Sequence, residues 1–224
     1  MLDLLLAILV PSRGRPHNMV RLAKAVAETC KVPYRIYCRV DDNDPTNDAY
    51  SGIPDIVLVN GPQIHFVASV NELAALATDA THFAILGDDV LPETVGWDAK
   101  LIDALGGRVG VAYGSDGLEH LHVFDLPTHV VVPVEMFRQL GWIALPALRH
   151  LYSDNVWRDI GKGVDNFVYC PDVKLTHLHR WTGLAPDDDT YRDANDFRYR
   201  RADKAAYIAW RNGPGYIDAM KTLQ

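Results

Sequence analysis

Short apolar runs alternate with amphipathic helical segments along the first half of the chain, and this alternation limits the folds open to it. The first run, Leu4 to Val10, ends at Pro11, and apolar residues then recur at helical spacing from Met19 to Ala27. The same pattern predicts strands at Tyr34 to Val40, Ile56 to Val59 and His82 to Leu86, and helices at Val67 to Ala77 and from Pro92 to about Leu105. This alternation predicts βαβ units, hence an α/β fold with a mostly parallel sheet flanked by helices, whose ligands bind at the carboxyl ends of the strands.

The second half of the sequence is more mixed, and we expect it to complete a site over a nucleotide-binding first half. It predicts strands at Val109 to Tyr113, His120 to Phe124 and His129 to Val132, helices at Val134 to Leu140 and Ser153 to Ile160, a hairpin or strand pair from Phe167 to His177, and a polar helical stretch from Asp193 to Arg211. The 224 residues suit one domain, divided here into residues 1–105, 106–190 and 191–224.

Composition narrows the class of protein. With 48% hydrophobic and 23% charged residues the chain is typical of a globular protein, and its formal charge of −7 disfavours a general nucleic-acid coat or a binder of anionic membranes. The three cysteines form no CxxC pair, which favours buried thiols in a reducing compartment. Leu4 to Val10 is far shorter than the roughly 20 residues of a membrane span, so we expect a cytoplasmic protein without one.

Three predicted strand ends carry groups suited to a nucleotide and a metal. The loop from Pro11 to Pro16 contains Arg13 and Arg15 and precedes a helix whose N-terminal amides can receive a phosphate; the plainer interpretation is a solvated loop. Gly87-Asp88-Asp89 ends a buried strand, where Mg²⁺ or Mn²⁺ would offset the repulsion between the two carboxylates; an acidic helix cap is the alternative. The acidic cluster of Asp41, Asp42, Asp44 and Asp48 is typical of a solvated turn, unless one carboxylate accepts hydrogen bonds from a nucleobase or ribose.

The second half adds three candidate residues. His177 and His179 share one face of an extended segment, and either could complete a metal site with a carboxylate; a surface position is the alternative. Asp154 lies in the first turn of a helix that Ser153 can cap, where it is either a general base or a carboxylate favoured by the helix dipole. We assign no chemistry to the other histidines, His17, His65, His82, His120, His122, His129 and His150.

Taken in order, these segments resemble the GT-A glycosyltransferases, in particular small family 2-like members encoded by actinobacteria and phages. The likeness spans roughly residues 4 to 180. It is carried by Ile8 to Pro16, Val40-Asp41-Asp42, Ile85 to Pro92 with Gly96-Trp97-Asp98, Leu151 to Trp157, and Pro171 to His179. The resemblance implies a metal-dependent transfer of a sugar from a nucleotide-sugar donor, with a UDP-sugar as the first choice, to an acceptor hydroxyl.

The resemblance also implies roles for single residues. Pro11, Ser12, Arg13 and Arg15, with Asp41 or Asp42, would surround the donor, and Asp88 and Asp89 would take the place of the DxD motif. Mn²⁺ or Mg²⁺ would lie on Asp89 and His177, with His179 as the second choice, and Asp154 would be the base of an inverting enzyme. The chain departs from the family pattern at Gly87, where many members have a first Asp, and at Ser153, where a Glu usually precedes the catalytic Asp.

The acceptor is left open between a DNA base, a protein and a glycan. Residues 192–211 hold six basic and three acidic side chains, and the interleaved Tyr191, Phe197, Tyr199 and Tyr207 could stack on bases, which makes a hydroxymethylated base of phage DNA one candidate. The plainer interpretation is a solvated helix that packs through Tyr199, Ala202, Ala206 and Trp210. Two other functions remain as alternatives: a sugar nucleotidyltransferase, and a non-catalytic nucleotide- or carbohydrate-binding protein of the same fold.

Overall fold

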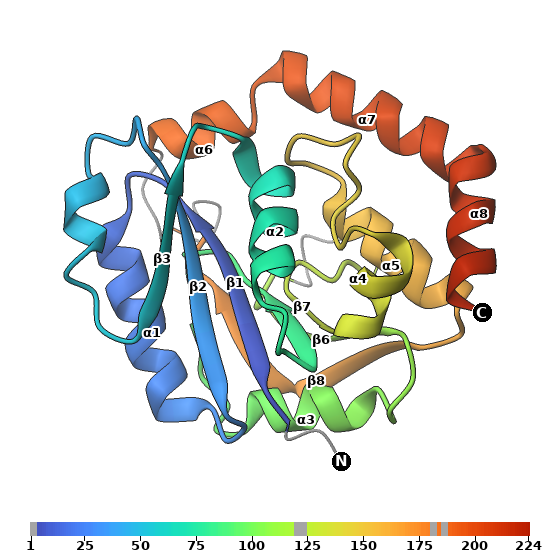
Figure 1. Ribbon diagram of the computed structural model, residues 1–224, viewed down its shortest axis with the longest axis horizontal. Coiled ribbons are helices and arrows are strands. Elements are labelled where there is room, and N and C mark those ends of the chain that lie inside the picture. Colours follow the sequence, from blue (N-terminus) through green and yellow to red (C-terminus); the bar gives the residue numbers. More distant parts are fainter. Residues whose placement is uncertain (1–3, 119–124, 180–182, 185–187) are drawn as a thin grey trace.

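One sheet runs through the whole molecule, with a parallel core and a mixed second half. The computed structural model describes residues 4–118, 125–179, 183–184 and 188–224. The strand order is β3-β2-β1-β4-β7-β6-β8-β5 (Figure 1). The strands are β1 (Leu6–Ser12), β2 (Tyr34–Asp41), β3 (Ile56–Gly61), β4 (His82–Ile85), β5 (Val90–Pro92), β6 (Val111–Ser115), β7 (Val130–Pro133) and β8 (Phe167–His177).

The first four strands, β1 to β4, are parallel, as the sequence predicts. β1 pairs with β2 and β4, and β2 pairs with β3. β7 then pairs antiparallel with β4 and β6, so the sheet continues without a break across the predicted division at residue 105. The carboxyl ends of β1, β2 and β4 therefore meet at one edge, which Figure 1 shows at the top.

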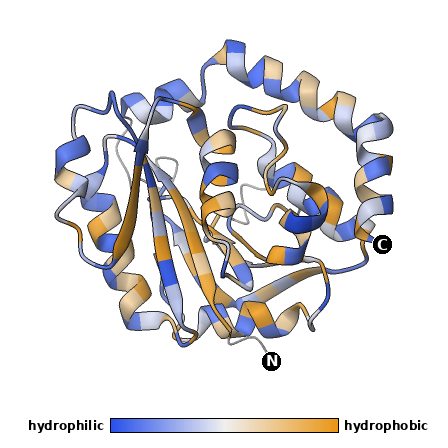
Figure 2. Ribbon diagram, in the orientation of Figure 1, coloured by the Kyte–Doolittle hydropathy of each residue, from blue (hydrophilic) through white to orange (hydrophobic). Residues whose placement is uncertain are grey.

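Helices cover both faces of the sheet. They are α1 (Pro16–Thr29), α2 (His65–Leu76), α3 (Trp97–Ala104), α4 (Val134–Leu140), α5 (Ser153–Gly163), α6 (Asp189–Ala194), α7 (Phe197–Asn212) and α8 (Pro214–Leu223), with a short 3₁₀ helix η1 (Asn47–Tyr50). Ala7 and Leu9 of β1 face a core shared with α2, α4, α5 and α8, whereas Leu6, Ile8 and Val10 face a core shared with α1 and α3. A strand that is buried on both faces must be apolar throughout, and Figure 2 shows hydrophobic residues concentrated along these strands.

Two predicted elements differ in the structure. The helix expected from Pro92 begins at Trp97, because Val90–Pro92 instead pairs antiparallel with Leu175 to His177 of β8. The hairpin expected from Phe167 to His177 is one strand, β8, which pairs with β6 in its first part and with β5 in its last. Its register shifts at Gly114, where a Cβ would collide with the backbone oxygen of Val173. The strand expected at His120 to Phe124 lies outside the described residues.

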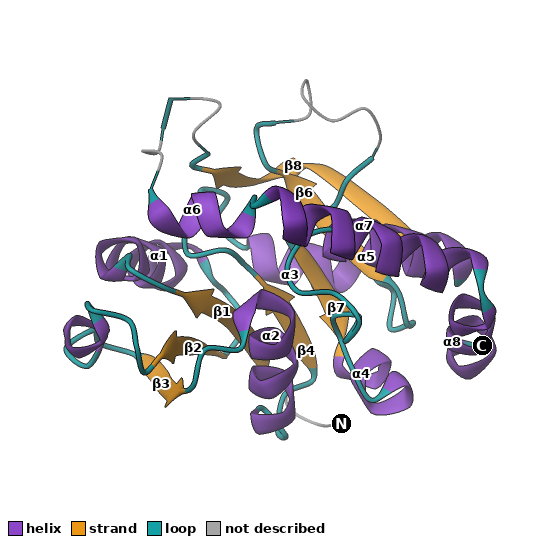
Figure 3. Ribbon diagram, turned by 90° about the horizontal axis from the view of Figure 1, so that it is seen from above, coloured by secondary structure: helices purple, strands orange, loops and turns teal. Residues whose placement is uncertain are grey.

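The C-terminal segment forms three helices, where the sequence predicts one polar helical stretch. α6 and α7 follow one another across the carboxyl edge of the sheet (Figure 3), and α8 turns back along its side. Within α7 the buried residues are Asp203 and Trp210, while Ala202, which the sequence places on the packed face, is exposed. In the described part of the chain, no helix has the length and apolar character needed to cross a membrane.

Asp203 joins α7 to the loop before α5. Its carboxylate is 2% exposed, and it accepts hydrogen bonds from the backbone N–H groups of Arg149, His150 and Leu151 at 2.8, 3.0 and 2.8 Å. Three N–H groups that converge on one buried carboxylate hold this loop in a single conformation. The segment that leads into Asp154 is therefore an ordered wall.

Removal of the Asp203 carboxylate should destabilise the protein. Asp203→Ala leaves three N–H groups without their acceptor, so we expect the free energy of unfolding to fall by about 3 kcal/mol. Asp218→Ala, at an exposed position of α8, is the matched control and should change the free energy of unfolding by less than about 0.5 kcal/mol. Urea unfolding measures both variants, and equal values for the two would contradict the role given to Asp203.

Candidate active site

A cavity of about 540 Å³ opens at the carboxyl edge of the sheet, and it collects nearly all the residues that the sequence singles out. Its walls come from β1 and the loop after it, the ends of β2 and β4, the start of α5, the end of β8, and α6. The predicted residues that line it are Pro11, Ser12, Arg13, Arg15, Asp41, Asp88, Asp89, Asp154, His177 and His179. Asp42 is exposed and lines a separate cavity of about 320 Å³ together with Asp44 and Asp48.

Asp88 is the buried member of the acidic pair. Its Oδ2 accepts a 2.6 Å hydrogen bond from Ser12, and its Oδ1 accepts longer ones from Arg15 at 3.3 Å and Asn18 at 3.4 Å. Burial, and then the charge of Asp89, raise the pKa of Asp88 to about 6. Both oxygens of Asp88 are thus engaged within the protein.

Asp89 reaches toward β8. Its Oδ1 lies 3.4 Å from Nε2 of His177, and its Oδ2 lies 3.5 Å from Nη1 of Arg15. Burial would raise the pKa of Asp89, but the hydrogen bond from His177 and the charges of His177, Arg15 and His129 outweigh it and lower that pKa. Asp89 therefore stays ionised beside an imidazole.

Gly87 is where this chain departs from the family pattern, and its surroundings show why a side chain does not fit there. A Cβ on Gly87 would lie 2.6 Å from Oδ1 of Asp89. A first aspartate at this position would push Asp89 out of its place beside His177. In this chain the acidic pair is consequently Asp88 and Asp89, with Asp89 alone turned toward β8.

Arg15 supplies the positive charge that the sequence analysis assigns to a divalent cation. Its Nη1 faces Asp88 and Asp89, while its Nε and Nη2 form a two-pronged ion pair with Asp188 at 2.6 and 2.7 Å. Burial lowers the pKa of Arg15, but the hydrogen bond to Asp188 and the charges of the three carboxylates outweigh it and raise that pKa. The guanidinium is therefore a permanent cation in the wall of the cavity.

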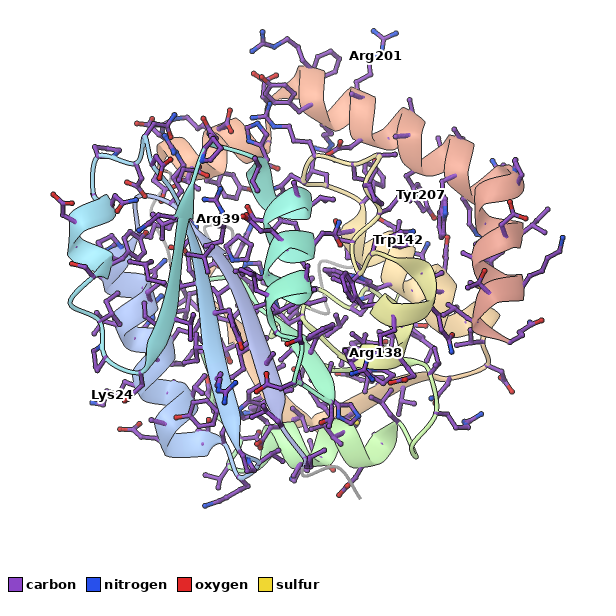
Figure 4. All side chains as sticks on the ribbon, in the orientation of Figure 1. Lys24, Arg39, Arg138, Trp142, Arg201 and Tyr207 are labelled. Atoms are coloured by element: carbon purple, nitrogen blue, oxygen red, sulfur yellow. The ribbon has the colours of Figure 1, made fainter. Side chains whose placement is uncertain are left out.

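A second group of charges lies at the ends of β1 and β2. Arg13 donates a 2.9 Å hydrogen bond to Asp41 and a 2.6 Å one to Asn43. Arg39 is 2% exposed, lies 3.6 Å from Asp41 and donates a 2.7 Å hydrogen bond to Glu72 (Figure 4). These contacts turn Asp41, rather than Asp42, toward the cavity.

Asp154 lies across the cavity, in the first turn of α5. The helix begins after Tyr152, whose backbone is left-handed with a φ of 69°. Oδ1 of Asp154 accepts a 2.8 Å hydrogen bond from the backbone N–H of Asn155, and the carboxylate is half-buried. The Asp203-bound loop that precedes it gives this carboxylate a rigid support.

The cavity suits a divalent ion that a substrate helps to bind. Among the described residues, no three His, Cys, Asp or Glu side chains are grouped to hold an ion by themselves. The 3.4 Å between Oδ1 of Asp89 and Nε2 of His177 is close to the about 3 Å that separates neighbouring ligands of an octahedral ion. Such ions take their other ligands from water and substrate phosphates. The His179 ring centroid is 5.0 Å from that of His177.

Several cavity residues escape the sequence analysis. His65, His129 and His150, to which it assigns no chemistry, line the cavity, and so do Arg39, Arg149 and Arg200. Arg39 is a charged residue within a predicted strand, and this feature of the sequence could have identified it as a candidate site residue. Nothing in the sequence links Asp188 to Arg15, because their 173-residue separation is closed only by the fold.

The aromatic residues of the C-terminal segment pack against the protein. The guanidinium of Arg149 lies 3.3 Å from the ring centroid of Tyr199, and the Tyr207 ring stacks on Tyr152 at 5.4 Å. Tyr207 also donates a hydrogen bond to Asp159, whereas Arg201 projects outward (Figure 4). These contacts agree with the packed-helix interpretation and leave only Phe197, 74% exposed, among the four aromatics as a large exposed ring.

Comparisons with known proteins bear on the fold. No family model matches the sequence, and no curated protein matches it. Among solved structures, the mannosyltransferase PcManGT from Pyrobaculum calidifontis, in complex with GDP-Man and Mn²⁺, superposes with a TM-score of 0.61 at 13% identity over 96% of this chain and 73% of that chain. The chain has a GT-A-like fold. S. aureus TarS gives a TM-score of 0.55 at 12% identity over 77% of this chain and 36% of that one.

These likenesses confirm the predicted fold class, an α/β sheet with a mostly parallel core between helices. At such low identities they do not extend to the residues of the cavity or to a reaction. The roles of the site residues therefore depend on the geometry described above.

The pH dependence of stability should report on His150. Burial lowers the pKa of His150 to about 4, with the charges of Asp203 and Asp89 acting in the opposite direction. The unfolded chain, with a histidine pKa near 6.5, therefore takes up the proton first as the pH falls. The wild type should lose about 2 kcal/mol of stability between pH 7 and 4.5 through this residue.

His150→Gln removes the titrating group, so its urea midpoint should fall less than that of the wild type over the same pH interval. Urea unfolding at pH 7 and 4.5 measures the difference. Identical pH dependence in the two proteins would contradict the burial of a neutral His150.

Proposed function

We propose that this chain is a metal-dependent glycosyltransferase that moves a sugar from a nucleoside diphosphate sugar to an acceptor hydroxyl. One observation carries the proposal: a single cavity, at the carboxyl edge of a GT-A-like sheet, is lined by Arg13 and Asp41, by the Asp88–Asp89 pair with His177, and by Asp154. These are the groups needed for a nucleotide, a diphosphate with its metal, and an acceptor hydroxyl.

The donor would lie between the ends of β1, β2 and β4. Arg13 and Asp41 would contact the nucleoside, and Arg15, in the loop that leads into α1, would contact the diphosphate. UDP is the first choice from the sequence. GDP is an equal candidate for testing, since PcManGT, a structure of similar fold, is in complex with GDP-Man and Mn²⁺.

Asp89 and His177 would hold the metal, and His179, which lies beside His177, is the second choice for the histidine ligand. A bound Mn²⁺ or Mg²⁺ supplies positive charge that stabilises the leaving diphosphate. Arg15 would add a second charge at the same phosphates. As the bond between the sugar and the diphosphate breaks, the acceptor oxygen bonds to the sugar carbon from the opposite face and gives its proton to Asp154, which describes an inverting transfer.

The acceptor is proposed only as a hydroxyl. The stacking of Tyr207 on Tyr152 and the contact of Tyr199 with Arg149 remove the argument that these rings stack on DNA bases. A hydroxymethylated base in phage DNA therefore draws no support from the fold, and glycan and protein hydroxyls belong in the acceptor screen beside it.

Donor binding is tested by thermal stabilisation. UDP, GDP, CMP and dTDP are each added with and without Mn²⁺, and one diphosphate at 100 times its Kd should stabilise the protein by about 2.7 kcal/mol, only when metal is present. Asp89→Asn should abolish the shift, and Asp48→Asn, exposed in the separate acidic cavity, should keep it. No shift with any nucleotide would contradict the proposal.

The role of Asp154 is tested by turnover. With the donor identified, Asp154→Asn should bind the nucleotide as the wild type does but transfer sugar about 10²- to 10⁴-fold more slowly. Asp165→Asn, exposed just beyond the other end of α5, is the control and should transfer at the wild-type rate. Chromatography of the glycosylated product measures both, and full activity of Asp154→Asn would remove Asp154 as the base.

A further inference from the structure

Arg15 lies where a cation compensates the acidic pair. Its Nη1 is 3.3 Å from Oδ1 of Asp88 and 3.5 Å from Oδ2 of Asp89, and its side chain is only 14% exposed. The two adjacent carboxylates, Asp88 buried and Asp89 partly buried, repel each other, and this guanidinium offsets that repulsion without any metal. The protein thus carries its own counter-cation.

Two further contacts keep the guanidinium in place. Asp188, which also accepts a 2.8 Å hydrogen bond from the backbone N–H of Tyr191 at the start of α6, binds Nε and Nη2 at 2.6 and 2.7 Å. The backbone N–H of Arg15 donates to the Tyr50 hydroxyl at 2.9 Å. These contacts fix the backbone of Arg15 and two of its three guanidinium nitrogens. The third nitrogen, Nη1, faces Asp88 and Asp89.

Asp89 is therefore shared between two partners. Arg15 is at its Oδ2, and His177 is at its Oδ1. A divalent ion between Asp89 and His177 would lie within a few ångströms of the Arg15 charge, and like charges at that separation in a partly buried site repel strongly. A divalent ion that binds without a nucleotide therefore has to displace the Arg15 guanidinium or bind against its repulsion.

We propose that Arg15 makes the binding of a divalent metal at Asp89 and His177 depend on a nucleoside diphosphate. This inference rests on the proposed donor site. The oxygens of a diphosphate match the planar geometry of the Arg15 guanidinium. When a diphosphate binds, the guanidinium therefore gives up its hydrogen bonds to the carboxylates and forms hydrogen bonds to the phosphates instead. The diphosphate also brings negative charge, and Asp89 is released to the metal. Metal and nucleotide then bind with positive coupling, and Arg15 is the residue that creates it.

The test measures Mn²⁺ binding from the electron paramagnetic resonance signal of the free ion, with and without the nucleoside diphosphate that stabilises the protein. In the wild type, the nucleotide should tighten Mn²⁺ binding at least about tenfold. Arg15→Gln removes the charge, so Mn²⁺ alone should bind about tenfold more tightly than to the wild type, and the nucleotide should add less than about threefold.

Two variants serve as controls. Arg15→Lys keeps the charge and should bind Mn²⁺ alone as weakly as the wild type. Arg201→Gln removes an exposed arginine of α7 that projects away from the cavity, and should leave the affinity for Mn²⁺ alone unchanged. Arg15→Met, which keeps an unbranched side chain without the charge, replaces Arg15→Gln if the latter does not fold, and it should show the same tightening.

The outcomes separate this inference from the function it rests on. If Mn²⁺ binds the wild type with nucleotide, but Arg15→Gln and Arg15→Met bind Mn²⁺ alone no more tightly than the wild type does, the counter-cation role is overturned and the donor site stands. If no protein holds Mn²⁺ with any nucleoside diphosphate, the inference and the proposed function are both overturned.

Discussion

The constraint on which the rest of this structure depends is the placement of two adjacent carboxylates, the buried Asp88 and the partly buried Asp89, just after the end of β4. Asp88 and Asp89 repel each other, so the chain must bring hydrogen-bond donors and positive charge to them from elsewhere. Ser12 is the last residue of β1, Arg15 comes from the loop after it, and His177 comes from the end of β8. The acidic pair therefore joins segments from both ends of the sequence at one edge of the sheet.

The C-terminal helices complete this edge through two more aspartates. Asp188 holds the guanidinium of Arg15, and Asp203 holds the backbone of the loop that leads into Asp154. The first contact ties α6 to the side of the cavity where we propose the donor, and the second ties α7 to the side where we propose the acceptor. The C-terminal segment, which the sequence identifies only as polar and helical, thus supports the cavity on both sides. Some of its charged side chains, such as Asp188 and Asp203, contact other parts of the protein.

Much of the fold could be predicted from the sequence, because strand segments buried on both faces are apolar throughout, as residues 6–10 are, and because parallel strands must place their polar carboxyl ends together. Predictions from local sequence were wrong where strand pairing across the sheet determines the structure. Pro92, which favours the start of a helix, instead ends β5, and β5 pairs with β8. The candidate site was recognisable where its residues follow strand ends, as Asp88 and Asp89 do. Asp188 and His129 could not be found, since only the fold brings Asp188 to Arg15 and His129 to the cavity.

The central claim is that Asp89 and His177 form the metal end of a donor site. It is tested most directly by crystals grown with Mn²⁺ and the stabilising nucleoside diphosphate, using anomalous diffraction at the manganese edge. The account predicts one strong peak within about 2.3 Å of Oδ1 of Asp89 and of Nε2 of His177, bridged to the diphosphate. A peak in the separate cavity lined by Asp42, Asp44 and Asp48, with none beside Asp89, would contradict it.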